Sequence, residues 1–148
     1  RLAGMGTTAV VVEVQDDILL WSSVGDSRLY VYHKDILEQI TTDHSMVQEL
    51  VEAGEITKDE MKVHPQRNLL TRAVGVDETL QVDSGRLPIA SGERILLCTD
   101  GLSGYVSDDV IKSILESTED NEEALQLLMD AVYEAGAGDN VTIIIGTL

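Results

Sequence analysis

The sequence of 148 residues contains no phenylalanine and only five aromatic side chains, Trp21 and four tyrosines. So few aromatic rings argue against a stacking surface for nucleic-acid bases. Basic residues are also scarce, because 10 lysines and arginines stand against 27 acidic residues and give a formal charge of −17. Since such a charge repels nucleic-acid phosphates and anionic membranes, we expect neither as a partner. A phosphorylated substrate is compatible with this charge where a bound cation reverses its local sign.

Long hydrophobic runs and pairs of cysteines are missing as well. The longest apolar runs, such as residues 18–21 and 95–98, have strand length and fall far short of the roughly 20 residues of a membrane span. Residues 1–12 contain neither the basic stretch nor the cleavage site of a signal peptide. Cys98 is the only cysteine and cannot form an internal disulfide, so we expect a cytoplasmic protein with a buried, unreactive thiol.

The residues that are present predict a single folded domain. Hydrophobic residues make up 43% of the chain, and the length suits one domain. Two amphipathic helices near the C-terminus are predicted to begin at the capping residues Ser107 and Asn121. Hairpin-linked strands followed by a pair of helices favour an α+β fold in which the helices cover one face of an antiparallel sheet. The strands are predicted from apolar, β-branched runs at residues 7–14, 18–24, 29–33, 36–40, 80–87, 94–98 and 141–148.

Residues 41–75 interrupt the strands with a different periodicity. Apolar residues recur at helical spacing over residues 46–51, with Ser45 as the N-cap. Thr57 and Glu60 form a capping-box pattern that predicts a second, short helix. We therefore expect a polar helical flap at about residues 41–75, inserted between strands and more mobile than they are.

Three predicted loops place an aspartate beside a glycine at the end of an apolar strand: Asp26, Asp100 and Asp139. Carboxylates gathered at one edge of a sheet are the oxygen ligands that Mg²⁺ or Mn²⁺ prefers. Asp and Gly are also common turn formers, so each loop alone fits a simple turn. Asp100 follows an almost wholly apolar strand, where burying a charge without a partner is costly and a bound metal offsets that cost. These aspartates are therefore the candidate metal ligands.

Other catalytic and metal-binding patterns do not fit. His33, His44 and His64 lack zinc-site spacing, and we expect each of them on the surface or in a hydrogen bond. The sequence contains no P-loop, dinucleotide-binding, zinc-protease or serine-hydrolase motif. Metal binding by carboxylate oxygens therefore remains the best-supported chemistry for this chain.

Seven short motifs occur in an order that resembles the metal-dependent type 2C protein serine/threonine phosphatases, especially the bacterial members. The motifs are GMGTT at 4–8, VGDSR at 24–28, TDHS at 42–45, HPQRN at 64–68, LTRAVG at 70–75, LCTDGL at 97–102 and GDNVT at 138–142. The resemblance implies a β-sandwich of two antiparallel sheets flanked by helices, with Mn²⁺ or Mg²⁺ ions at one end. It also implies hydrolysis of phosphoserine and phosphothreonine in proteins by a metal-activated water, on substrates of a serine/threonine kinase.

The same resemblance assigns roles to individual residues. Asp100 and Asp139 are expected to bind a dinuclear centre, and Asp26 together with Asp100 is expected to hold a third metal. The flap is expected beside the active site, where it affects substrate access, and Ser45 is expected to touch the substrate. No residue beyond the metal ligands is expected to be catalytic.

The family's upstream motifs have no counterpart in this sequence. They supply a bridging carboxylate and a phosphate-binding arginine, and neither Arg1 nor Arg28 is in a matching position. We therefore expect residues 1–148 to be a type 2C catalytic domain without its N-terminal portion, inactive alone, weak in metal binding and prone to self-association through uncovered strand edges. The alternative is a non-catalytic phosphatase-like domain that binds proteins and whose Asp-Gly loops are only turns.

Overall fold

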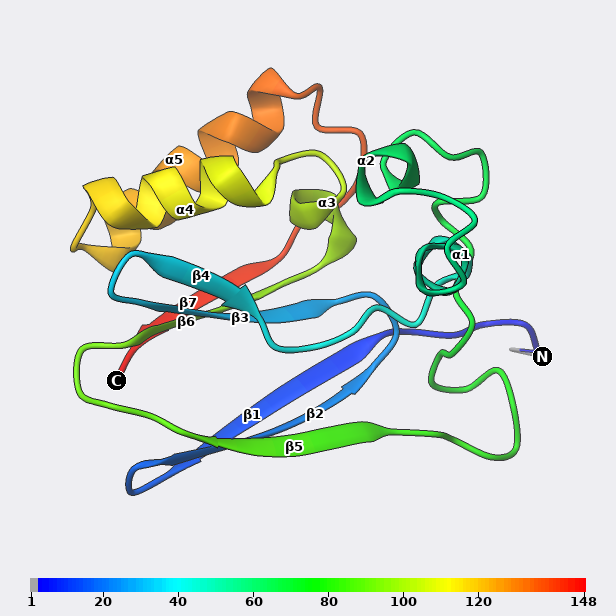
Figure 1. Ribbon diagram of the computed structural model, residues 1–148, viewed down its shortest axis with the longest axis horizontal. Coiled ribbons are helices and arrows are strands. Elements are labelled where there is room, and N and C mark those ends of the chain that lie inside the picture. The colour runs from blue at the N-terminus through cyan, green and yellow to red at the C-terminus, as the bar shows by residue number, and fades with distance from the viewer. Residues whose placement is uncertain (1–2) are drawn as a thin grey trace.

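Two antiparallel sheets and a pair of helices form three layers in the computed structural model, which describes residues 3–148 (Figure 1). One sheet has the order β1-β2-β5, with β1 at Ala9–Gln15, β2 at Ile18–Val24 and β5 at Asp83–Pro88. The other has the order β4-β3-β6-β7, with β3 at Arg28–His33, β4 at Ile36–Gln39, β6 at Arg94–Cys98 and β7 at Ile143–Thr147. The predicted α+β fold, an antiparallel β-sandwich flanked by helices, is confirmed.

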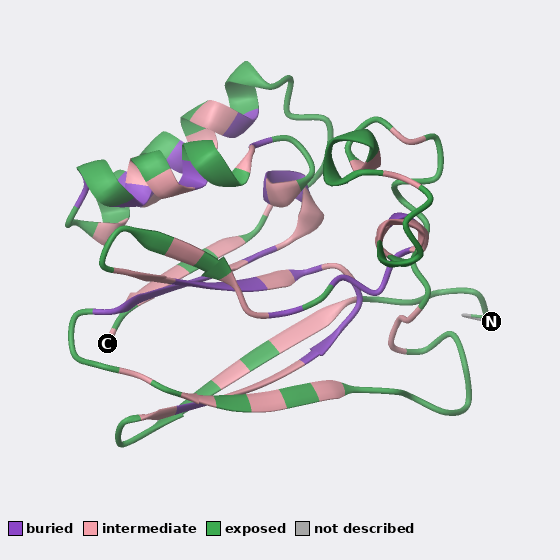
Figure 2. Cartoon of the chain, viewed as in Figure 1, coloured by how far each residue is buried: buried purple, intermediate pink, exposed green. Residues whose placement is uncertain are grey.

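The middle strands β3 and β6 are buried on both faces, because their side chains alternate between two cores. Leu29 and Ile95 pack between the sheets, whereas Tyr30, Leu96 and Cys98 face the helices. Figure 2 shows buried residues gathered along these strands, while exposed residues recur along β1 and β5. Alternation with a period of two residues thus builds two cores from one sheet. The predicted burial of the Cys98 thiol is confirmed.

The helices α4 (Asp108–Ser117) and α5 (Asn121–Glu134) cover the four-stranded sheet (Figure 1). Ser107 caps α4 as predicted, since its hydroxyl accepts a hydrogen bond from the Val110 amide. The N-cap of α5 is Asp120 rather than Asn121, because the Asp120 carboxylate reaches two amides of the first turn. The prediction was wrong by one residue at a position where both neighbours are good capping residues.

The flap contains α1 (Met46–Glu52) and α2 (Lys58–Met61), which lie beside the end of the sheets (Figure 1). Ser45 and Thr57 cap the two helices as predicted, through hydrogen bonds from the amides of Gln48 and Glu60. The strand predicted at residues 80–87 begins only at Asp83, since the pairing of β2 with β5 ends there. Within residues 3–148, no helix has the length and hydrophobicity needed to cross a membrane.

Candidate metal centre

The three predicted aspartates meet at one end of the four-stranded sheet. Strand register explains why, since Arg28 pairs with Cys98 and Cys98 pairs with Ile143. The loop before β3, the loop after β6 and the loop before β7 therefore leave the sheet side by side. Their aspartates, Asp26, Asp100 and Asp139, line a common cavity of about 480 Å³ between the core and the flap.

The carboxylates in this cavity repel one another. Burial, together with the negative charges of Asp100 and Asp43, raises the pKa of Asp26 to about 6. Burial likewise raises the pKa of Asp100, and the carboxylate of Asp139 adds to the shift. Both shifts mean that burial and neighbouring negative charges disfavour the ionised carboxylates of Asp26 and Asp100. A divalent cation between them would favour the ionised forms instead.

Two hydrogen bonds and a close backbone approach hold the loops of Asp100 and Asp139 together. The Thr99 amide donates to the Thr142 carbonyl at 3.1 Å, and the Thr142 amide donates to the Thr99 hydroxyl at 3.0 Å. A side chain at Gly101 would collide with the backbone of Asn140, so only glycine allows this approach. Sequence reasoning treated this glycine as a turn residue and also missed the short helix α3 (Asp100–Ser103). A helix of one turn has too little periodicity to be detected.

The loop that carries Asp26 is held by His44. The Gly25 amide donates to His44 Nδ1 at 2.9 Å, and the His44 amide donates to the Gly25 carbonyl at 2.9 Å. His44 is buried, so of the two predicted settings, surface or hydrogen bond, the second applies.

Arg28 is occupied by a neighbouring carboxylate on the cavity wall. Its Nε and Nη2 atoms donate to Asp43 at 2.9 and 2.7 Å, and its Nη1 atom donates to the Tyr30 hydroxyl at 2.8 Å. Tyr30 in turn donates to Asp108 at the start of α4, at 2.8 Å. Desolvation would lower the Arg28 pKa, but the Asp43 and Tyr30 contacts outweigh it and raise the pKa above its usual value. Sequence reasoning did not single out Asp43, because its partner lies 15 residues away.

Ser45 lines the same cavity, but its hydroxyl is already used at the N-terminus of α1. The Gln48 amide donates to it at 3.3 Å, and the residue is 2% exposed. Its predicted contact with substrate stays a prediction.

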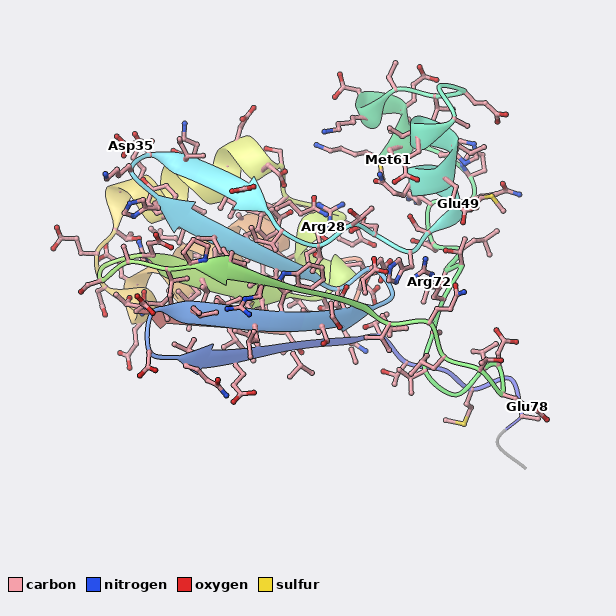
Figure 3. All side chains as sticks on the ribbon, turned by 60° about the horizontal axis from the view of Figure 1, so that its bottom comes forward. Arg28, Asp35, Glu49, Met61, Arg72 and Glu78 are labelled. Atoms are coloured by element: carbon pink, nitrogen blue, oxygen red, sulfur yellow. The ribbon has the colours of Figure 1, made fainter. Side chains whose placement is uncertain are left out.

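The flap contributes basic residues to the lining of the cavity. Lys58, Lys62 and Arg67 line the cavity together with the acidic residues of the core. None of the ion pairs found among the described residues involves these three side chains. Figure 3 shows Arg28 and Arg72 near the base of the flap, with Met61 and Glu49 within it. Acidic residues of the core and basic residues of the flap thus line one cavity, together with Asp43 and Asp59 of the flap.

The donor set suits a hard cation, although it is sparse. Asp26, Asp100 and Asp139 offer only oxygen atoms, which is the chemistry that Mg²⁺ and Mn²⁺ select. In residues 3–148, however, no three Asp, Glu, His or Cys side chains gather as a ready ligand set. A bound ion would therefore need water to complete its coordination.

Comparisons with known proteins identify the family of the chain. Residues 3–141 match the family profile described as Protein phosphatase 2C. The serine/threonine phosphatase stp of Listeria innocua is 36% identical over 144 residues, which make up 97% of this chain and 57% of that protein.

Solved structures give the same result. The crystal structure of the serine/threonine phosphatase PstP/Ppp of Mycobacterium tuberculosis superposes with a TM-score of 0.93 at 38% identity, covering 99% of this chain and 62% of that one. A structure of the PstP catalytic domain in complex with two manganese ions superposes with a TM-score of 0.85 at 35% identity, covering 96% of this chain and 58% of that one. The chain spans only 57% of the length of the curated relative described above. The family profile, the sequence relatives and the fold agree, and the chain belongs to the protein phosphatase 2C family.

Proposed function

We propose that the chain is part of a metal-dependent phosphatase that hydrolyses phosphoserine and phosphothreonine in proteins. The observation that carries this proposal is the convergence of Asp26, Asp100 and Asp139 on one cavity, within a chain of this family. Phosphorylated proteins, the substrates of a serine/threonine kinase, would be its partners, and the cytoplasm its compartment. Residues 1–148 would form one part of the catalytic domain, with the flap at about residues 41–75.

Asp100 is proposed to serve two cation positions, one shared with Asp139 and the other shared with Asp26. Its position supports this role, because its charge affects Asp26 and the charge of Asp139 affects it. Bound Mn²⁺ or Mg²⁺ supplies positive charge that polarises phosphoryl oxygens and acidifies a water molecule. The residues of this chain hold the carboxylates in register through the paired ends of β3, β6 and β7.

The flap is proposed to border the substrate. Lys58, Lys62 and Arg67 face the same cavity as the aspartates, so they can attract the negative charge of a phosphorylated protein. Ser45, at the start of α1, is proposed to contact the bound side chain. Arg28 is not proposed as a phosphate ligand, because Asp43 occupies its guanidinium group.

The chain alone is proposed to bind metal weakly and to be nearly inactive. The three aspartates offer few charged ligands for two or three cations, and hard cations need several such ligands for tight binding. Full activity would then belong to a longer protein that carries this sequence.

The test is a phosphopeptide assay with Mn²⁺ on the longest natural protein that contains the chain. Asp100→Asn is expected to lower kcat by about 100-fold or more. Asp16→Asn, in the exposed turn between β1 and β2, is the matched control and should leave kcat unchanged. Absence of turnover in the unmodified protein, or full turnover in the Asp100→Asn variant, would reject the proposal in favour of a non-catalytic binding domain.

A further inference from the structure

We infer that His44 is a positioning residue that connects the base of the flap to the loop that carries Asp26. This role rests on the proposed function, because it requires that Asp26 binds a cation. The connection runs through a chain of hydrogen bonds that we name the His44 clamp. Its members are Gly25, His44, Asp83 and Arg72.

The clamp begins at the peptide before Asp26. Both polar backbone groups of Gly25 bond to His44, the amide to Nδ1 at 2.9 Å and the carbonyl to the His44 amide at 2.9 Å. Gly25 has a φ of 105°, and a side chain there would collide with Thr8. One residue therefore fixes the orientation of the peptide from which Asp26 continues.

The hydrogen bond to Gly25 determines the state of the imidazole ring. Because the Gly25 amide can only donate, His44 Nδ1 accepts and carries no proton. The proton of the neutral ring is then on Nε2, which donates to Asp83 Oδ2 at 2.7 Å. Since His44 is 5% exposed, water does not compete for either nitrogen.

Asp83 links this ring to both ends of the flap. Its Oδ2 atom accepts from His44, just before α1, and its Oδ1 atom accepts from Arg72 Nη1 at 2.9 Å, after α2. The two flanking segments also meet directly, because the Thr71 amide donates to the His44 carbonyl at 3.0 Å. A single carboxylate at the start of β5 thus holds the entry and the exit of the flap, while the entry residue holds the Asp26 loop.

The clamp matters because neighbouring negative charges repel the carboxylate of Asp26. Asp100 and Asp43 repel its carboxylate, so a loosely held loop would let Asp26 turn away from the cavity. A rigid Gly25 peptide keeps the carboxylate at the place where a cation would bind both Asp26 and Asp100. Movement of the flap base is expected to reach Asp26 through the same four residues.

Two substitutions of His44 separate its two bonds. In His44→Asn, the side-chain oxygen lies close to the place of Nδ1 and still accepts from Gly25, but the side chain is too short for Asp83. In His44→Gln, the side-chain amide reaches the place of Nε2 and still donates to Asp83, but Gly25 loses its acceptor. The variants are similar in polarity and differ in which half of the clamp survives.

The first measurement is amide hydrogen exchange, followed by NMR in the metal-free chain. In His44→Gln, protection of the Gly25 amide is expected to fall about tenfold, whereas in His44→Asn it should stay within about twofold of the unmodified chain. In His44→Asn and in Asp83→Ala, the Thr71 amide should lose protection instead, because the flap base is released. Asp83 lies at a half-exposed strand end, so Asp83→Ala tests the clamp even where a His44 variant does not fold.

The second measurement is Mn²⁺ binding by calorimetry in the longest natural protein that contains the chain. The dissociation constant is expected to rise about tenfold in His44→Gln and to change little in His44→Asn. Equal effects of the two His44 variants would overturn the clamp. So would unchanged protection of the Gly25 amide in His44→Gln, or unchanged protection of the Thr71 amide in Asp83→Ala. Failure of the proposed function looks different: the longest natural protein that contains the chain would show no Mn²⁺ response, while amide exchange in the chain still responded to the variants as described.

Discussion

Arg28 holds Asp43 in a two-pronged ion pair, with Nε to Oδ1 at 2.9 Å and Nη2 to Oδ2 at 2.7 Å. The side chains are 16% and 7% exposed, so the pair is largely removed from water. It joins β3 to the segment that enters the flap, and therefore connects a rigid strand to the most polar part of the chain.

Loss of this pair should destabilise the fold. Arg28→Met leaves the Asp43 carboxylate buried with only Gln39 as a side-chain donor, which should cost about 3 kcal/mol in the free energy of unfolding. Arg28→Lys cannot form both hydrogen bonds and should cost about 1–2 kcal/mol. Urea unfolding measures both values. Arg86→Met, on the exposed side of β5, is the control and should stay within about 0.5 kcal/mol of the unmodified chain.

Metal should stabilise the chain only slightly. With a dissociation constant of about 1 mM, 10 mM Mn²⁺ would raise the free energy of unfolding by about 1.4 kcal/mol. Asp100→Asn should abolish this increase, and Asp16→Asn should preserve it. Thermal unfolding with and without Mn²⁺ measures the effect, and a micromolar two-site isotherm in calorimetry would contradict the weak binding expected here.

The hydrogen bond of Asp83 with His44 and its ion pair with Arg72 predict a loss of stability in acid. A hydrogen bond from His44 and a further contact with Arg72 hold the pKa of Asp83 below its usual value. The stabilisation is therefore complete above the unfolded pKa of about 4 and disappears as the pH falls through the lower folded value. Because the carboxylate is 36% exposed, solvent limits the effect to about 0.5–1 kcal/mol.

Urea unfolding of the unmodified chain and of Asp83→Asn checks this pH dependence. The two proteins should differ at pH 7 and converge as the pH falls through the lowered pKa of Asp83, below which both side chains are neutral. A difference that persists unchanged in acid would show that packing, rather than charge, gives Asp83 its effect.

Gly101→Ala should disturb the metal centre through its backbone. The new methyl group would press on Asn140 and separate the loops of Asp100 and Asp139, at a cost of about 2–3 kcal/mol. Gly92→Ala is the control, because a methyl group there meets open space although the φ of 93° is strained. Only Gly101→Ala is expected to weaken Mn²⁺ binding in calorimetry.

Self-association is expected through the outer edge of β1. Among residues 3–148 this strand pairs only with β2, and its exposed residues include Val11 and Val14. Sedimentation should detect dimers whose fraction rises with concentration, and Val11→Lys should suppress them, since an edge lysine opposes strand pairing. Val63→Lys, on the exposed flap, is the control. A monomer at all concentrations would refute the expectation.

Local sequence signals predicted much of this fold. Hydrophilic caps such as Ser45, Thr57 and Ser107 act within one helical turn, so a short window of sequence is sufficient to detect them. Asp26, Asp100 and Asp139 could be found because each stands beside a glycine at a strand end, and the family motifs placed them in order. Their convergence on one cavity depends on the register of the strands. The sequence predicted an antiparallel sheet, but only the structure gives its register.

The residues that hold the site in place could not be predicted in the same way. His44 bonds to a glycine 19 residues earlier and to an aspartate 39 residues later. Asp43 likewise depends on Arg28, across 15 residues. Polar pairs at such separations have no periodicity or fixed spacing, so their roles become visible only after the chain has folded.

The burial of β3 and β6 on both faces has a consequence for how such proteins diversify. Asp26 lies before one of these strands and Asp100 follows the other, so the candidate metal ligands are attached to the part of the molecule least tolerant of substitution. Variation among relatives should then concentrate in the outer sheet and the flap, where new substrates can be accommodated without shifting the carboxylates.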